Sequence, residues 1–339
     1  MQPRHFGGFE YACSDLMNVI QALAKGCSST AWCYGLAAAH QWLIGAFPLQ
    51  SQHDVWGANP DSLVSASHAS AAIAEEVEGG LKIKGSWGFA SNCDNAHWVL
   101  LCVTFRPSEK RAGPAGGLLL VPACDYVIED NWHTVGLAGT GSKNIIIDEP
   151  VFVPRHRVLT FDELHSGGLP GIAHHDDPII RMPFSVAAPA MLACVALGTL
   201  QGAIEECKDL MGVDSSREHA FGEVHRAASL LHLRTRLEEA AAMADAGALL
   251  VRRDTEEVQE LVNQGKAIPP AIRLRNRCNL AWALRHTAQA AAGLFEASGA
   301  GGLFLSNGVQ RAWRDIGAMS QHMTIGWDAM DALQGTQPT

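Results

Sequence analysis

The sequence contains no run rich in lysine or arginine, and its 25 basic residues are outnumbered by 35 acidic ones, which gives a formal charge of −10. Nucleic acids and anionic membrane surfaces bind clustered basic side chains, so we expect neither as a partner. The nine cysteines include no Cys-x-x-Cys pair, and the first residues lack the basic head and apolar run of a signal peptide. Both absences favour the reducing cytoplasm over a secreted, disulfide-linked protein.

Several catalytic motifs are also missing, among them G-x-G-x-x-G, G-x-x-x-x-G-K-[ST], H-E-x-x-H and G-x-S-x-G. The run from His174 to Asp177 offers metal-ligating side chains, but it has neither helical spacing nor a third partner. We interpret it as a solvated loop and predict no metal site.

Two stretches carry no charge, residues 26–53 and residues 182–204, and both are long enough to span a bilayer. Both contain polar side chains and proline and are richer in alanine than in leucine. We therefore interpret them as helices buried in a soluble bundle.

The spacing of apolar residues changes twice along the chain. Residues 14–57 have helical periodicity, interrupted at Gly26 and Pro48. Residues 62–160 show short alternating runs separated by glycine-rich turns, as in a β-domain. Long helical patterns return at 182–211, 216–253, 271–296 and 308–323, and in the second of them one stripe carries Leu230, Leu233, Leu237, Ala241 and Ala244.

We predict a mainly α fold with a central β-domain. Its segments are an N-terminal helical domain at residues 1–60, a β-domain at 61–160, a linker at 161–180 and a C-terminal helical bundle at 181–339.

Candidate functional residues are spread over these segments. Trp32, Leu36 and His40 follow one another at steps of four along one helix face. From the helix alone, a core histidine with a satisfied hydrogen bond is the more frequent interpretation of His40. Near the C-terminus, Arg311 and Asp315 have the spacing of a structural ion pair.

Three segments together resemble a known superfamily: GGLKIKGSWGFASNCDNAHWVLL, WHTVGLAGTGSKNIIIDEPVFVPRHR and GAGGLFLSNGVQRAWRDIGAMSQH. In this order they resemble the acyl-CoA dehydrogenases, and more closely their oxygenase branch, the oxygenase components of two-component, reduced-flavin-dependent (group D) monooxygenases. The resemblance runs from about Phe6 to Asp328. It implies the acyl-CoA dehydrogenase-like fold, with N-terminal helices, a β-barrel-like middle domain and a C-terminal four-helix bundle. Relatives carry further helices before the segment that matches residues 2–8, so we expect the chain to begin inside the first domain.

One position separates the two chemistries of this superfamily. Most acyl-CoA dehydrogenases place a glutamate base about nine residues after the Arg-Asp pair that matches Arg314 and Asp315. Here that position is Met323, and no glutamate follows Glu296. The neighbouring His322 matches a histidine that oxygenases place over the flavin, so the residues favour the oxygenase, although some dehydrogenases carry the glutamate on another helix.

The resemblance implies that reduced flavin (FADH2 or FMNH2) arrives from a separate NAD(P)H:flavin reductase and reacts with O2 to give a C4a-hydroperoxide. This adduct then hydroxylates a phenol- or indole-type ring. By the same resemblance Ser91 lies near flavin N5, Phe89 lies against the ring system and His322 assists the hydroperoxide. His40 faces the aromatic substrate, with Trp32 and either Ser65 or Ser67 beside it; an imidazole with a pKa near 6.5 can accept a phenol proton.

Flavin anchoring is implied for two further residues. Arg217, in SREHAFGEV, matches an arginine that contacts the flavin phosphate of a neighbouring subunit, although a surface arginine is an equally frequent interpretation. Gly301, in the turn at 299–302, matches a loop that approaches the cofactor of an adjacent subunit. Both imply a homotetramer.

Three other functions stay open at the level of sequence. These are N- or S-oxygenation on the same scaffold, an acyl-CoA dehydrogenase, and a non-catalytic relative that binds flavin or a partner.

Overall fold

The computed structural model describes residues 1–339 with the exception of 10, 71, 107–114, 167, 215–222 and 326–339. Contacts between residues divide the chain into two compact units. We call residues 1–12, 36–133 and 140–184 the sheet unit, and residues 13–35, 134–139 and 185–339 the helical unit. Helix α2 (Ser28–Ala46) begins in the helical unit and ends in the sheet unit.

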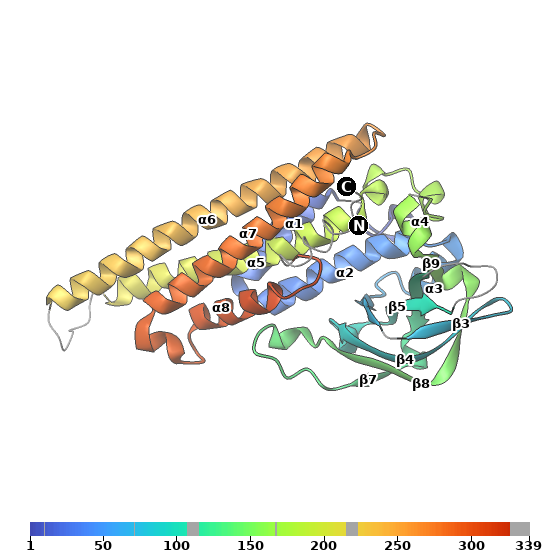
Figure 1. Ribbon diagram of the computed structural model, residues 1–339, viewed down its shortest axis with the longest axis horizontal. Helices are drawn as coiled ribbons and strands as arrows, with labels where there is room; N and C mark the ends of the chain where they lie inside the picture. The colour runs from blue at the N-terminus through green and yellow to red at the C-terminus, as the bar shows by residue number, and fades with distance from the viewer. Residues whose placement is uncertain (10, 71, 107–114, 167, 215–222, 326–339) are drawn as a thin grey trace, which may run out of the picture. The chain divides into compact units, whose positions relative to one another are not determined.

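Nine strands of the sheet unit are described, and Figure 1 shows several of them. Their order is β7-β8-β4-β3-β5-β6-β9, while β1 pairs with β5 and β2 pairs with β4. The strands are β1 (Val64–Ser67), β2 (Ala69–Ser70), β3 (Ile73–Val77), β4 (Gly80–Ala90), β5 (Trp98–Phe105), β6 (Gly116–Pro122), β7 (Val127–Glu129), β8 (Lys143–Pro154) and β9 (Val158–Thr160).

Alternating side chains explain why these segments form strands. Leu81, Ile83 and Trp87 of β4 point into one core, while the residues between them are more exposed. Gly79, at φ +79°, allows the tight turn from β3 into β4, a backbone angle that L side chains rarely adopt. The alternating runs predicted at 62–160 are therefore confirmed as strands. The same unit also contains α3 (Leu49–Trp56) and α4 (Phe161–Ser166).

The helical unit is built from long helices, and Figure 1 shows α6 and α7 running side by side. They are α1 (Cys13–Gly26), the start of α2, α5 (Phe184–Asp214), α6 (Glu223–Asn263), α7 (Pro270–Ala297) and α8 (Gly308–Met319). Leu237 and Ala244, from the predicted stripe on α6, are buried in the core of this unit, and Leu233 and Ala241 pack against it. The side chain of Leu230 lies outside the described residues. The four C-terminal helices are confirmed, but α6 continues beyond its predicted end at 253, α8 ends before 323, and residues 216–222 of the second prediction lie outside the described residues.

The predicted linker contains more structure than its composition suggested. It begins with α4, and His175 is buried, with its Nε2 3.0 Å from Oε1 of Gln52. Because an amide oxygen only accepts, this His175 nitrogen carries the proton. The prediction of a solvated loop is therefore wrong at His175, although His174 is exposed. The domain boundaries at residues 60, 160 and 180 stay a prediction.

One described helix stretch, Phe184–Asp209, is long and apolar enough to cross a membrane. However, 78% of its most apolar window is buried inside the protein, as in the core helix of a soluble protein. This fits the interpretation of the second uncharged stretch as a buried helix of the bundle.

Candidate active site

The end of strand β4 carries an irregular backbone. The pairing of β4 with β8 shifts register between Trp87 and Ala90, and Phe89 between them has φ +62°. This left-handed conformation is uncommon for a bulky residue and often marks a functional position. The Phe89 ring is 68% exposed and meets Trp132 edge to face, with ring centroids 6.1 Å apart. The structure thus presents an open aromatic surface at this strand end.

Three hydroxyl groups lie next to one another beyond this bulge. The Oγ of Ser91 is 2.7 Å from that of Ser142, which is also 2.7 Å from Oγ1 of Thr140. All three residues are buried. Gly141, at φ +52°, lies between Thr140 and Ser142 and allows the loop to turn both hydroxyls the same way. The hydroxyls form a short hydrogen-bonded chain that holds the Ser91 side chain in place.

Strand β1 connects His40 to the end of β4. Nδ1 of His40 lies 2.8 Å from the carbonyl oxygen of Val64, and the next residue, Ser65, donates its hydroxyl to the carbonyl of Ser91 at 2.8 Å. Ser67 binds the end of β4 in the same way, at the carbonyl of Gly88. The structure therefore brings together His40, Ser65 and Ser91. It also shows that both candidate serines hold backbone, so a substrate contact at Ser65 stays a prediction.

His40 is an uncharged base at neutral pH. Its side chain is 2% exposed, and burial lowers its pKa to about 4, with nearby His68 lowering it further and the Val64 carbonyl opposing the shift. The ordinary pKa near 6.5 expected from the sequence is therefore wrong for this site. Because a carbonyl can only accept, Nδ1 carries the proton and Nε2 keeps a lone pair. Within the described part of the chain, Nε2 has no protein hydrogen-bond partner.

In the helical unit, Trp32 and His322 lie together. The Trp32 side chain is buried, and its ring meets that of His322 edge to face at 5.3 Å. Nδ1 of His322 accepts from the backbone N–H of Thr324 at 3.3 Å and lies 2.9 Å from the Thr324 hydroxyl. Nδ1 is therefore the acceptor nitrogen, and in the neutral ring Nε2 carries the proton as a hydrogen-bond donor.

Asp315 has different partners from those the sequence suggested. Its buried carboxylate accepts the N–H of Leu137 at 2.6 Å and the hydroxyl of Ser28. The predicted Asp315 pair with Arg311 is absent from the ion pairs of the described residues, so that prediction is wrong. Together with Arg314, which donates to the carbonyl of Val135, Asp315 holds the segment 134–139 against α8.

The structure does not test two of the predicted flavin contacts, Gly301 and Arg217. Gly301 lies in the short helix at 299–303, where a Cβ would meet no atom of this chain within 4 Å. Nothing within the described part of the chain requires glycine there, so its role toward a neighbouring subunit stays a prediction. Arg217 lies outside the described residues.

Sequence reasoning missed Trp132, Thr140, Ser142 and Thr324 as members of the site. The first three lie inside the segment WHTVGLAGTGS, so a motif signal was present, but only folding shows that its hydroxyls meet Ser91. No group of three or more metal-ligating side chains occurs among the described residues.

The residues at the end of β4 fit a flavin. A flavin ring system is flat and aromatic with a polar edge, and it is held by stacking on aromatic rings and by hydrogen bonds to that edge. Phe89 supplies exposed aromatic surface with the half-buried Trp132 beside it, and Ser91 supplies a hydroxyl nearby.

Residues 190–327 match the family described as acyl-CoA dehydrogenase, C-terminal domain. The chain is 39% identical to the oxygenase component of FADH(2)-dependent resorcinol hydroxylase from Rhizobium sp. (strain MTP-10005), over 99% of this chain and 83% of the relative. The crystal structure of 3-HSA hydroxylase from Rhodococcus sp. RHA1 superimposes with a TM-score of 0.91 at 30% identity, over 99% of this chain and 84% of that one. XiaF from Streptomyces sp., solved with FADH2 and glycerol, gives a TM-score of 0.85 at 26% identity, over 98% and 82%.

The fold and the residues around β4 therefore define a flavin-dependent enzyme built on the acyl-CoA dehydrogenase scaffold. The chain belongs to the family of oxygenase components of two-component, flavin-dependent aromatic monooxygenases. The predicted family, fold and reduced-flavin cofactor are confirmed.

Proposed function

We propose that this protein hydroxylates a carbon atom of a phenol-type ring, using FADH2 from a separate reductase and O2. The observation that carries the proposal is His40, a buried neutral imidazole whose tautomer is fixed by Val64. Its Nε2 can accept the hydrogen bond of a phenolic hydroxyl. The name of the 39% identical relative, resorcinol hydroxylase, supports the same substrate class.

Bound reduced flavin supplies, together with O2, the electrophilic oxygen that the ring attacks. His40 holds the phenolic O–H and accepts its proton as the ring becomes electron-rich. With the imidazole pKa near 4 and a phenol pKa near 10, full transfer costs about 8 kcal/mol before the reaction begins. His40 therefore orients the hydroxyl in the resting complex and takes the proton only as oxygen transfer makes that proton acidic.

The other residues hold and shield the flavin. Phe89 would stack against the ring system, and Ser91, held by its contact with Ser142, would hydrogen-bond the polar edge of the flavin. His322 would offer its Nε2–H as a hydrogen-bond donor toward the flavin, and the edge-to-face contact with Trp32 would help to hold the plane of its imidazole. Exclusion of water from this region favours oxygen transfer over the loss of hydrogen peroxide.

Partners and location follow from the same proposal. We infer a homotetramer, in which Arg217 and Gly301 meet the flavin of a neighbouring subunit, and a cytoplasmic location, where a reductase can deliver FADH2 by diffusion.

The test combines the protein with a flavin reductase, NADH, FAD and resorcinol under ¹⁸O2. We expect a ring-hydroxylated product that carries one ¹⁸O per molecule, with little peroxide. Hydroxylation without ¹⁸O would contradict the proposal, as would complete conversion of O2 to peroxide.

Two matched substrates test the alternatives. Oxidation of an aromatic amine or thioether in preference to resorcinol would indicate N- or S-oxygenation. Reduction of bound FAD by an acyl-CoA thioester would indicate a dehydrogenase, which the missing glutamate after Glu296 disfavours.

A further inference from the structure

The helical unit contains a cavity of about 280 Å³ between the first turns of α5, the last third of α6 and the first half of α7. Its walls are largely apolar and include Val186, Pro189, Val251 and Leu280. Cavities that bind small molecules begin at roughly this size, about 300 Å³. None of the predicted flavin or substrate residues lines this cavity.

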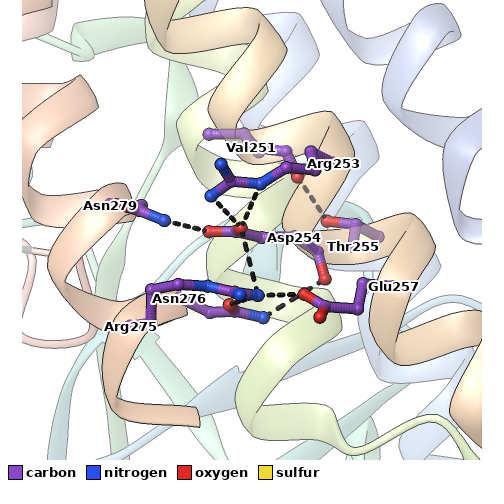
Figure 2. Close-up of polar contacts among 8 residues, drawn as sticks. All are labelled: Val251, Arg253, Asp254, Thr255, Glu257, Arg275, Asn276 and Asn279. Carbon is purple, nitrogen blue, oxygen red and sulfur yellow. Dashed lines mark hydrogen bonds and ion pairs between the residues drawn. The ribbon is translucent and has the colours of Figure 1, made fainter. Parts of the chain in front are cut away.

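A buried carboxylate, Asp254, lines the cavity, and Figure 2 shows the polar side chains that surround it. Nε and Nη2 of Arg253 donate to its Oδ1 at 3.1 and 2.6 Å, and Nδ2 of Asn279 donates to its Oδ2 at 2.8 Å. Arg275 is 3.7 Å from the same carboxylate and also pairs with Glu257. Two acidic and two basic side chains thus neutralise one another in this cluster.

Two further arginines of α7 line the cavity without such compensation. Arg273 and Arg277 are four residues apart and lie on one helix face. Among the described residues neither has an ion pair, and Arg277 donates a hydrogen bond of 3.0 Å to the Thr324 carbonyl. Burial lowers the pKa of Arg277, which shows that its guanidinium has lost part of its hydration. Arg273 is exposed, so an anion between the two side chains would offset the desolvation of Arg277 and gain a second charge-assisted contact from Arg273.

Arg277 also connects this cavity to the candidate active site. Its Nη1 donates to the carbonyl of Thr324, whose N–H and hydroxyl contact Nδ1 of His322. A ligand that draws the guanidinium away from Thr324 changes the hydrogen bonds that set the orientation of His322.

We propose that this cavity binds a small amphipathic carboxylate, such as an aromatic acid, and that its occupancy is transmitted to His322 through Arg277 and Thr324. The carboxylate lies between Arg273 and Arg277, and the apolar body packs against Val186 and Leu280. The binding is independent of the proposed function, whereas the consequence at His322 rests on it.

Calorimetric titration of the flavin-free protein with 2-naphthoate tests the binding. We expect one saturable site with a Kd below about 1 mM, and no comparable binding of the uncharged 2-naphthamide. Arg273→Gln and Arg277→Gln should each weaken binding about tenfold or more, because each removes one charge-assisted contact. Arg285→Gln changes an exposed arginine of the same helix that does not line the cavity and should leave the affinity unchanged.

A variant that keeps both arginines separates this site from binding elsewhere. Ser185→Phe places a large ring at an exposed position on the cavity wall and should abolish binding without unfolding the protein. Absence of saturation in the wild type would overturn the proposal, as would equal affinity for the amide or unchanged binding in both glutamine variants. If the variants instead alter the sedimentation coefficient while 2-naphthoate does not bind, the cavity is an interface between copies and the proposal is wrong.

Nitrogen-15 spectra of histidine-labelled, flavin-free protein test the link to His322, whose signals are identified by their loss in His322→Gln. Saturating 2-naphthoate should shift the Nδ1 signal of His322 in the wild type and not in Arg277→Gln. Binding without such a shift would retain the site and overturn the link. Because neither measurement uses flavin, their failure is distinguishable from a failure to hydroxylate phenols.

Discussion

At the scale of single residues, the described site depends on two histidines whose tautomers are set by hydrogen bonds to neighbouring residues. Val64 leaves His40 with a lone pair on Nε2, and Thr324 leaves His322 with a proton on Nε2. At Nε2, His40 is thus a hydrogen-bond acceptor and His322 is a hydrogen-bond donor. The sequence identified both positions, but it could not give their tautomers, because the Val64 carbonyl and the N–H and hydroxyl of Thr324 reach the rings only on folding.

His40→Gln should lower the rate of phenol hydroxylation about 100-fold, the usual contribution of a positioned proton acceptor. In the wild type the rate should stay level from pH 8 to pH 5 and fall as His40 becomes protonated near pH 4. Steady-state product formation across this range measures both effects. A wild-type profile that falls with a midpoint near pH 6.5 would show that His40 is not the neutral base described.

The same burial makes the stability of the protein depend on pH. Because the pKa of His40 is lower in the folded than in the unfolded chain, the unfolded chain binds more protons between pH 6.5 and 4. Stability is therefore lost as the pH falls through this window, by about 3 kcal/mol for this residue. Urea unfolding of His40→Gln, compared with the wild type at pH 7 and pH 4.5, should show a smaller loss in the variant.

Ser142→Ala should increase the fraction of O2 released as peroxide severalfold, because the Ser91 hydroxyl loses the partner that aims it. The comparison is Ser51→Ala, which removes a buried hydroxyl of the same unit that donates to the His156 carbonyl. A peroxide assay during turnover distinguishes the two. Equal leakage in both variants would indicate a general loss of packing and argue against a positioning role for Ser142.

At the scale of elements, the bulge at the end of β4 contributes more to the candidate flavin site than the regular part of the strand. Alternation predicts the strand, and the turn at Gly79 predicts where it begins, because both are local properties of the chain. The left-handed conformation of Phe89 cannot be predicted from the local sequence, since phenylalanine does not favour it. The register of β8 against β4 imposes it, and a single sequence does not encode that register visibly.

Phe89→Gly separates the ring from the backbone. Glycine relieves a strain of about 1–2 kcal/mol, and little packing is lost from a ring that is 68% exposed. The free energy of unfolding should therefore change by less than about 1 kcal/mol, while the affinity for FADH2 falls about tenfold. Anaerobic flavin titration measures the affinity, and Phe89→Tyr, which keeps the ring, should restore it. Unchanged affinity in the glycine variant would remove Phe89 from the flavin site.

The helices were predicted more completely than the connections. The ends of α1 and α2 lie at Gly26 and close to Pro48, as their chemistry requires, and α3 lies within the stretch predicted to be helical. By contrast, α4 and the buried His175 lie in the stretch whose composition suggested a linker. Asp315 illustrates the same limit. Its spacing from Arg311 favoured an ion pair, and tertiary contacts with Leu137 and Ser28 prevailed.

At the scale of the whole molecule, the proposed tetramer gives a direct measurement. Sedimentation equilibrium should yield four times the mass of the 36.3 kDa chain. Gly301→Trp, at an exposed position where this chain leaves open space, should shift the protein toward smaller species and weaken flavin binding without changing its helix content. A monomeric wild type with full hydroxylase activity would show that neither Gly301 nor Arg217 acts across subunits.

The two units alternate along the sequence, and the ribosome releases the chain from its N-terminus. This order affects how the protein folds during synthesis. Helix α1 is made early, yet its partners are late: Gln21 contacts Cys194 of α5, and Asn18 accepts a hydrogen bond from Arg252 of α6. At about 5–20 residues per second, α1 waits roughly 10–40 s for α6, with its apolar face uncovered in the meantime. Production of the protein should therefore depend on chaperones that shelter nascent chains, and slower translation should lower the yield of soluble enzyme.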